Sequence, residues 1–178
     1  LLDRRQESRM SDVVSSTFAA VYVPFLASFV VLMMAAWHNA WVFVVFELMV
    51  IANDTGGWAV GVMFGKHPMA PALSPKKSWE GFAGSALTAI AVGVVGLWLL
   101  GASWWWGVVA GISIAFVGTM GDLTESLIKR EAGLKDMSQI LPGHGGVLDR
   151  VDALLMSAPV AYFIFAWALP GISWESSH

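Results

Sequence analysis

Carboxylates are the side chains best suited to chemistry in the polar segment 121–152. Asp149 and Asp152 are three residues apart, so on a helix they would share a face. Asp122 and Glu125 repeat that spacing at the inner end of the preceding apolar stretch. Carboxylates at two helix ends near a membrane surface suit Mg²⁺, which proteins usually hold with one or two carboxylates plus substrate phosphates. The spacing fits solvated acids equally well, or acids paired with the basic residues of the segment, Lys129, Arg130 and Arg150.

Three glycines surround His144 in the stretch 142–146, which reads PGHGG. Glycine lets the backbone approach a ligand closely and expose its N–H groups, so this stretch is a candidate substrate-binding turn. A tight bend before the last apolar stretch is the competing interpretation. His144 as a general base is a weaker hypothesis, because a histidine in a loop is usually just solvated.

Ser74 and Pro75 have the character of a helix start, with serine at the N-cap and proline at the first helical position. A helix N-terminus beside Lys76 and Lys77 is a ready anion site. The alternative is that these lysines are ordinary basic residues of a cytoplasmic loop. Glu80 follows at the membrane boundary, as a metal ligand, a lysine partner or an acid of the first helical turn.

Asn53 and Asp54 lie toward the inner end of an apolar stretch. Ionisable groups inside membrane helices are costly and usually face the bundle interior or a watery cavity. We therefore expect these two side chains to belong to a functional site.

The composition predicts the elements that must position these residues. Apolar residues make up 57% of the 178 and charged residues 13%, whereas a soluble domain carries about 25% charged residues. A bilayer span needs roughly 20 apolar residues. We predict an all-α, polytopic transmembrane helix bundle with cytoplasmic active-site loops and about five spans, at 17–37, 41–64, 81–100, 104–121 and 151–170. The absence of cysteine excludes disulfides, thiolate metal sites and a cysteine nucleophile.

The basic residues are all on one predicted side. If the spans alternate in direction, the ten Lys and Arg residues fall in segments 1–16, 65–80 and 122–150, which share a side. Basic loops stay in the cytoplasm. We predict a polar cytoplasmic segment at 1–16 and a membrane-embedded catalytic domain at 17–178, together forming the C-terminal part of a larger chain. The net charge of −3 implies no nucleic-acid partner.

The polar segments resemble the CDP-diacylglycerol synthase (phosphatidate cytidylyltransferase) family. That family's signature runs S-x-x-K-R, K-D, P-G-H-G-G and D-R-x-D, and the chain matches it in order and spacing at Ser126, Lys129, Arg130, Lys135, Asp136, Pro142, Gly143, His144, Gly145, Gly146, Asp149, Arg150 and Asp152. A second block at 53–57, 61–67 and 74–81 looks like the family's N-D-T, F-G-K and S-P-K-K-[ST]-W-E-G elements. Gly56 and Gly57 differ, standing where many members have a small residue and an aromatic one. The resemblance covers roughly residues 40–170.

The resemblance implies the transfer of a cytidylyl group from CTP to phosphatidic acid, which gives CDP-diacylglycerol and pyrophosphate. It implies that Asp122 and Asp149 bind a catalytic Mg²⁺, with Asp152 as a less certain ligand, and that Lys129 and Arg130 act on a phosphate beside it. The remaining matches are expected substrate-binding residues, namely Asn53, Asp54, Ser74, Lys76, Lys77, Glu80, Ser126, Lys135, His144, Gly145, Gly146 and Arg150.

Other functions compete with this one. A CTP-dependent polyprenol or dolichol-type kinase would also pair CTP with a membrane lipid, but the ending D-R-x-D favours the cytidylyltransferase. A transporter would suit Glu47 and Asp54, yet gives no reason for the dense basic, glycine-rich and acidic segment 126–152. We expect the protein in the bacterial inner (cell) membrane, with its active site facing the cytoplasm. The oligomeric state stays open, with a homodimer as one option.

The charge distribution predicts a topology that labelling can check. Single cysteines introduced at positions 77 and 176 should react with a membrane-impermeant thiol reagent from opposite faces, because all basic segments share one side and residues 171–178 lie on the other. Labelling of both positions from the same face would contradict the predicted topology.

Overall fold

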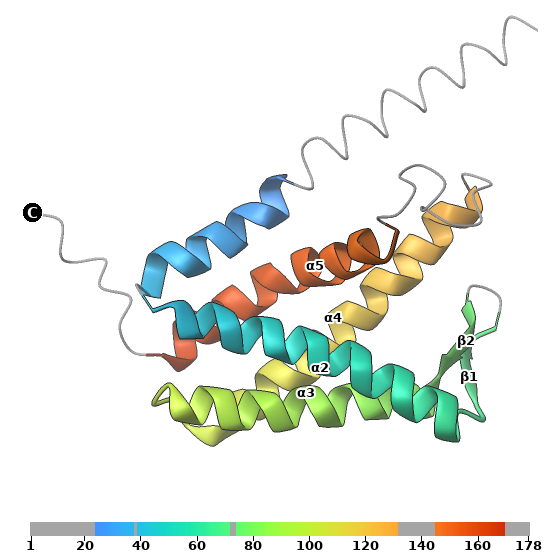
Figure 1. The fold of residues 1–178 in the computed structure, drawn as a ribbon, viewed down its shortest axis with the longest axis horizontal. Coiled ribbons are helices and arrows are strands. Elements are labelled where there is room, and N and C mark those ends of the chain that lie inside the picture. Colours follow the sequence, from blue (N-terminus) through green and yellow to red (C-terminus); the bar gives the residue numbers. More distant parts are fainter. Residues whose placement is uncertain (1–23, 38, 72–73, 132–144, 170–178) are drawn as a thin grey trace, which may run out of the picture.

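A computed structural model describes residues 24–37, 39–71, 74–131 and 145–169. Its helices are an N-terminal one at Pro24–Trp37, then α2 (Ala40–Phe64), α3 (Trp79–Leu99), α4 (Trp104–Glu131) and α5 (Gly145–Ala168) (Figure 1). The predicted all-α bundle is confirmed, and each predicted span overlaps a helix. Residues 17–23 of the first predicted span and residue 170 of the last lie outside the described residues.

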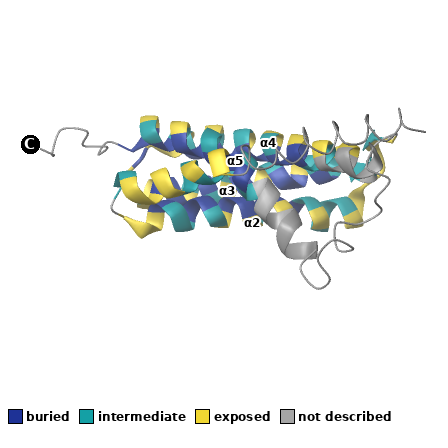
Figure 2. Ribbon diagram, turned by 90° about the horizontal axis from the view of Figure 1, so that it is seen from above, coloured by how far each residue is buried: buried dark blue, intermediate teal, exposed yellow. Residues whose placement is uncertain are grey.

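The helices are apolar enough to form a membrane bundle. Three of the described helices, α2, α3 and the first 21 residues of α4, are long and apolar enough to cross a bilayer, while Pro24–Trp37 and Leu154–Ala168 are shorter apolar stretches. Large apolar side chains such as Leu87, Val95 and Trp98 of α3 are exposed. Exposed positions, coloured yellow, recur along the helices of the bundle (Figure 2). Extended exposed apolar surface marks a face made for another apolar medium, so the chain is an integral membrane protein.

The interior of the bundle is filled by side chains from all five described helices, including Met33 of the N-terminal one. Phe46 and Met49 of α2, Leu97 of α3, Ile114 of α4 and Phe165 of α5 are fully buried and belong to one apolar cluster.

Side chains and glycine define the helix ends. The Asn39 side chain accepts a hydrogen bond from the Trp41 N–H, which caps α2. After α3, Gly101 adopts φ 88°, a left-handed conformation that favours glycine. The Ala102 N–H then reaches the Leu97 carbonyl at 2.9 Å, closing a Schellman-type turn. This turn reverses the chain into α4.

The segment between α2 and α3 is a β-hairpin, so the predicted helix start at Ser74 is wrong. Strand β1 (Pro68–Ala70) pairs antiparallel with β2 (Ser74–Ser78) in an irregular register. Pro75 lacks an N–H, and such an irregular two-stranded pair tolerates the missing donor. The cap is instead Ser78, whose Oγ accepts from the Gly81 N–H at 3.1 Å. Lys76 and Lys77 therefore lie on a strand and not at a helix N-terminus.

Two other helix ends differ from prediction. Helix α4 continues ten residues past the predicted end at 121, through Glu131, so Asp122 lies inside a helix and not at its end. Helix α5 begins at Gly145, which places Gly145 and Gly146 in its first turn, where a loop was predicted. The polarity of these segments misled the prediction, because a helix can leave the apolar layer and continue in water.

Glycines let α2 and α3 approach until their backbones nearly touch. A Cβ added at Gly84 would lie 2.5 Å from the Val60 Cβ and 2.7 Å from the Gly56 carbonyl oxygen. One added at Gly57 would lie 2.2 Å from the Ser85 Oγ, which explains why this chain has no aromatic residue at position 57. Small residues at such crossings allow the van der Waals contact that drives helix association in lipid.

The polar parts of the chain gather toward one end of the bundle. The β1–β2 hairpin, the end of α4 and the start of α5 lie toward that end, and the turn between α3 and α4 lies toward the other (Figure 1). The spans thus alternate in direction as the distribution of charges predicted.

Adding one methyl group at this crossing should destabilise the bundle. Gly84→Ala forces α2 and α3 apart, at a cost of about 1–3 kcal/mol in the free energy of unfolding. Gly61→Ala is the matched control, since its Cβ would lie 3.6 Å from the Gly81 Cα, at an ordinary contact distance. Denaturant-induced unfolding in detergent measures both. Equal stability of the two variants would contradict the close crossing.

Candidate active site

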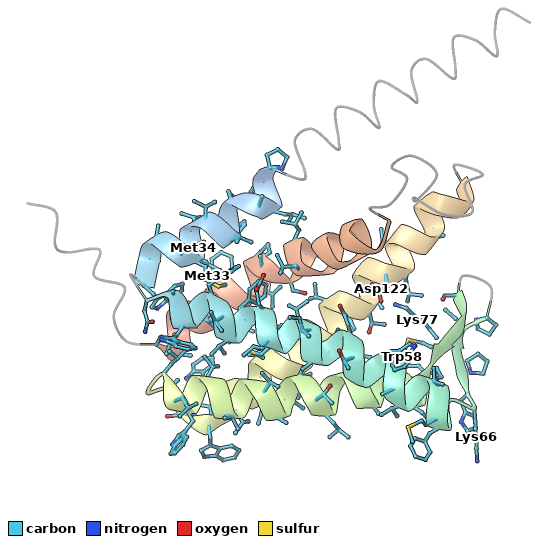
Figure 3. All side chains as sticks on the ribbon, viewed as in Figure 1. Met33, Met34, Trp58, Lys66, Lys77 and Asp122 are labelled. Carbon is cyan, nitrogen blue, oxygen red and sulfur yellow. The ribbon has the colours of Figure 1, made fainter. Side chains whose placement is uncertain are left out.

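An ion pair joins two segments that are far apart in the sequence. The Lys77 Nζ of β2 donates to the Asp122 Oδ2 of α4, across a separation of 45 residues (Figure 3). The side chains are 26% and 44% exposed respectively, so the pair is open to solvent on one side. An exposed cation and carboxylate held together in this way can each serve a charged ligand. Sequence reasoning proposed both residues for the site, and the structure brings them together.

The polar residues of α2 lie about one helical turn from Asp122. The Asn53 Nδ2 donates to the Asp54 Oδ1 at 3.3 Å. The same Asn53 Nδ2 atom would lie 3.0 Å from a Cβ added at Gly118 of α4. Gly118 is four residues before Asp122, so Asn53 packs against α4 about one turn from that carboxylate. The Asn53 side chain is buried, and its Oδ1 has no hydrogen-bond partner among the described residues. A buried carbonyl oxygen without a donor is a natural ligand for a cation or a water molecule.

Glu80 turns toward the chain segment that leaves α2. Its Oε2 accepts the N–H groups of Lys66 and His67, each at 3.2 Å, and its Oε1 lies 2.6 Å from the His67 Nδ1. Glu80 is in the first turn of α3, as one of its three predicted roles requires. These partners of the Glu80 carboxylate include neither a lysine side chain nor another carboxylate.

The remaining predicted residues are placed by their backbones or lie outside the described residues. Ser74 begins β2 and pairs with Ala70. The motif residues of α4 lie in its last turns and those of α5 in its first turns, with their side chains outside the described part, namely Ser126, Lys129, Arg130, Asp149, Arg150 and Asp152. The side chain of Lys76 is also outside it, and so are Lys135 and His144 entirely.

The donor set can be compared with the needs of Mg²⁺. The described part of the chain contains no group of three or more His, Cys, Asp or Glu side chains. It does offer oxygen donors, the exposed carboxylate of Asp122 and the unpartnered Oδ1 of Asn53. Mg²⁺ prefers oxygen ligands and often takes one or two carboxylates, filling the rest with water and phosphate. The residues present therefore fit such an ion.

Sequence reasoning missed three residues that position the site. His67 holds Glu80, while Ser85 and Thr88 of α3 donate to the carbonyls of Asn53 and Ala52, each at 2.7 Å. Ser85 and Thr88 lie three residues apart near Gly81 and Gly84, a small-residue pattern that signals a helix interface. His67 carried no comparable signal, because its partner is thirteen residues away.

Comparison with known proteins shows which family and which relatives the chain is similar to. The model of the "Cytidylyltransferase family" matches residues 1–168. A phosphatidate cytidylyltransferase of Mycobacterium bovis is 46% identical over 157 residues, which cover 87% of this chain and 51% of that protein. Its namesake from Mycobacterium leprae is 42% identical, covering 86% and 49%. The one from Haemophilus influenzae is 39% identical, covering 72% and 47%. The chain thus spans about half the length of these relatives.

The Lys77–Asp122 pair should contribute little to folding. Exposed ion pairs are worth about 0–1 kcal/mol, since solvent screens them. Lys77→Ala and Asp122→Asn should each change the free energy of unfolding in detergent by less than about 1 kcal/mol. If either variant lowers the free energy of unfolding by more than about 2 kcal/mol, the pair stabilises the fold, and the prediction that it contributes little is contradicted.

Proposed function

Because this chain belongs to the cytidylyltransferase family, we propose that it carries the machinery that transfers a cytidylyl group from CTP to phosphatidic acid. The products are CDP-diacylglycerol and pyrophosphate, in phospholipid biosynthesis. The observation that carries the proposal is the contact between Lys77 and Asp122, which joins one block that resembles the family to the helix on which the other block begins. The names of the relatives support the same reaction.

The chemistry explains the residue types at this site. A phosphate monoester has a second pKa near 6, so the attacking oxygen of phosphatidic acid is already largely ionised at neutral pH. That oxygen forms a bond to the α-phosphorus of CTP while the bond to the pyrophosphate oxygen breaks. No proton has to be removed in this step, and no general base is required. The main obstacle is repulsion between two anionic substrates.

Cationic groups reduce that repulsion. Lys77 is the described cation nearest to Asp122, and its flexible ammonium can turn from the carboxylate to a phosphate oxygen. The backbone places Lys129 and Arg130 further along α4 and Arg150 in α5, toward the same end of the bundle. In the proposal, Lys76 and Lys77 help to hold substrate phosphates, and this second basic group positions a phosphate beside the metal.

Mg²⁺ is part of the proposal, because two phosphate-bearing substrates call for more positive charge than the lysines supply. Asp122 and Asp149 would hold the ion, with Asp152 as a further ligand and Asn53 or Asp54 nearby. When bound, it would polarise phosphate oxygens and stabilise the departing pyrophosphate. With an ion held there, the Asp122 carboxylate would no longer need Lys77 as its partner, and the ammonium would be available to a substrate phosphate.

The location of the site suits a lipid substrate. The polar residues lie at one end of an apolar bundle, and the helices beside them expose apolar side chains. A diacylglycerol tail can remain in the bilayer while its phosphate reaches Lys77 and Asp122. We propose that this end faces the cytoplasm, in the inner membrane of a bacterium, because the basic residues are concentrated there.

A radiolabelled CTP assay tests the proposed reaction. The full-length protein in detergent micelles should convert α-labelled CTP to a lipid-soluble product and release pyrophosphate, only when phosphatidic acid and Mg²⁺ are both present. Phosphorylation of a polyprenol with release of CDP would establish the kinase alternative instead. No CTP consumption with either lipid would contradict both.

The carboxylates should be needed for turnover but not for folding. Asp122→Asn and Asp149→Asn each remove a proposed ligand of the ion, so turnover should fall by at least about a thousandfold, as for loss of a strong transition-state contact. Both variants should keep the elution volume and helical circular dichroism of the parent in detergent. Near-normal rates at saturating Mg²⁺ in either variant would remove that residue from the site.

A further inference from the structure

The hairpin that carries Lys77 is too small to hold its own position. Its strands contain three and five residues, and an isolated two-stranded hairpin is marginally stable in water. Yet β2 delivers the Lys77 ammonium to one carboxylate on α4. The hairpin must therefore be fixed by contacts outside its own ladder.

Those contacts lie at the base of the hairpin, where the chain leaves α2 and enters α3. The Trp79 N–H donates to the His67 carbonyl at 3.0 Å. Next to it, the Glu80 carboxylate accepts the backbone N–H groups of Lys66 and His67, and its other oxygen pairs with the His67 ring. Four hydrogen bonds thus tie the two ends of the hairpin connection together.

Both oxygens of Glu80 are occupied by this arrangement. Hydrogen bonds to an ionised carboxylate are roughly twice as strong as neutral ones, and the two N–H groups converge on Oε2 at 3.2 Å each. The His67 Nδ1 sits 2.6 Å from Oε1, so this nitrogen donates its proton there. The Glu80 side chain is 26% exposed and the His67 side chain 78%, which places the pair at the surface of the bundle.

We propose that Glu80 and His67 form a clamp that positions Lys77 against Asp122. In this assignment both are positioning residues, and neither binds the metal ion or a substrate phosphate. Lys77 is three residues before Glu80, and Ser78 between them caps α3. The segment 77–80 is therefore held at both its strand end and its helix end, which fixes the backbone from which the Lys77 side chain reaches Asp122. The consequence for turnover rests on the proposed function, whereas the consequence for hairpin order does not.

The first test measures hairpin order without any reaction. Hydrogen–deuterium exchange of the full-length protein in detergent should show the amides of residues 66, 67 and 79 exchanging at least about tenfold faster in Glu80→Ala, because the clamp no longer protects them. Lys66→Ala is the matched control, since only the Lys66 backbone N–H takes part. Unchanged exchange in Glu80→Ala, or equal acceleration in the control, would overturn the clamp.

The second test separates positioning from ligation. Lys77→Ala should lower kcat/KM about a hundredfold, as for a lost phosphate contact. Glu80→Ala should lower it less, and the double variant should match Lys77→Ala alone, because the clamp acts through that lysine. Glu80→Gln, which keeps one acceptor oxygen, should recover part of the loss.

If the losses in kcat/KM of the two single variants multiply in the double variant, Glu80 acts independently of Lys77 and the proposal is overturned. The same holds if Glu80→Ala weakens the dependence of turnover on Mg²⁺ in the Lys77→Ala background, because Glu80 would then be a ligand of the ion. Faster exchange of the hairpin amides on adding CTP would also overturn the proposal, because it would mean that a phosphate displaces the carboxylate. If the parent protein shows no turnover at all, the proposed function fails while the exchange experiment still decides the clamp.

Discussion

The close crossing of α2 and α3 is the contact on which the rest of this bundle depends. In a bilayer the lipid tails are as apolar as the side chains, so helices associate through packing and hydrogen bonds and not through hydrophobic burial. Here Gly56 and Gly84 allow backbone contact. At that short separation Ser85 and Thr88 reach carbonyl oxygens of the neighbouring helix. The crossing also sets the distance that the hairpin between the two helices must bridge.

Glycines also allow close contact between α3 and α4. Gly107 and Gly111 of α4 lie against Val94 and Ile90 of α3, so closely that a Cβ at either glycine would come within 2.5 Å of a backbone atom. Helix α4 is thereby fixed relative to α2 through α3. Because α4 carries Asp122 and the α2–α3 connection carries Lys77, the geometry of their pair follows from two glycine-mediated interfaces.

The polar site shows how the fold handles charge at a membrane surface. A carboxylate near an apolar layer is costly unless it is paired or solvated, and Asp122 has both a lysine partner and solvent exposure. Glu80, only three residues from that lysine, is satisfied separately by Lys66 and His67. Two acids of the same region therefore have different roles. Asp122 stays partly accessible to solvent beside its lysine, and both oxygens of Glu80 are occupied by Lys66 and His67.

The sequence by itself determined the membrane class, the approximate positions of the helices and two polar residues that the structure brings together, Lys77 and Asp122. Apolar runs of bilayer length and one-sided basic charge are local properties of the chain. Tertiary structure decided where the polar segments begin and end as helices, because α4 continues through Asp122 to Glu131 and Ser74 pairs with β1. It also decided the partner of Glu80. The hydrogen-bond partners of a helix end or a carboxylate depend on which groups the folded chain brings close. His67 is thirteen residues from Glu80 in the sequence, so the fold and not the local sequence brings the two together.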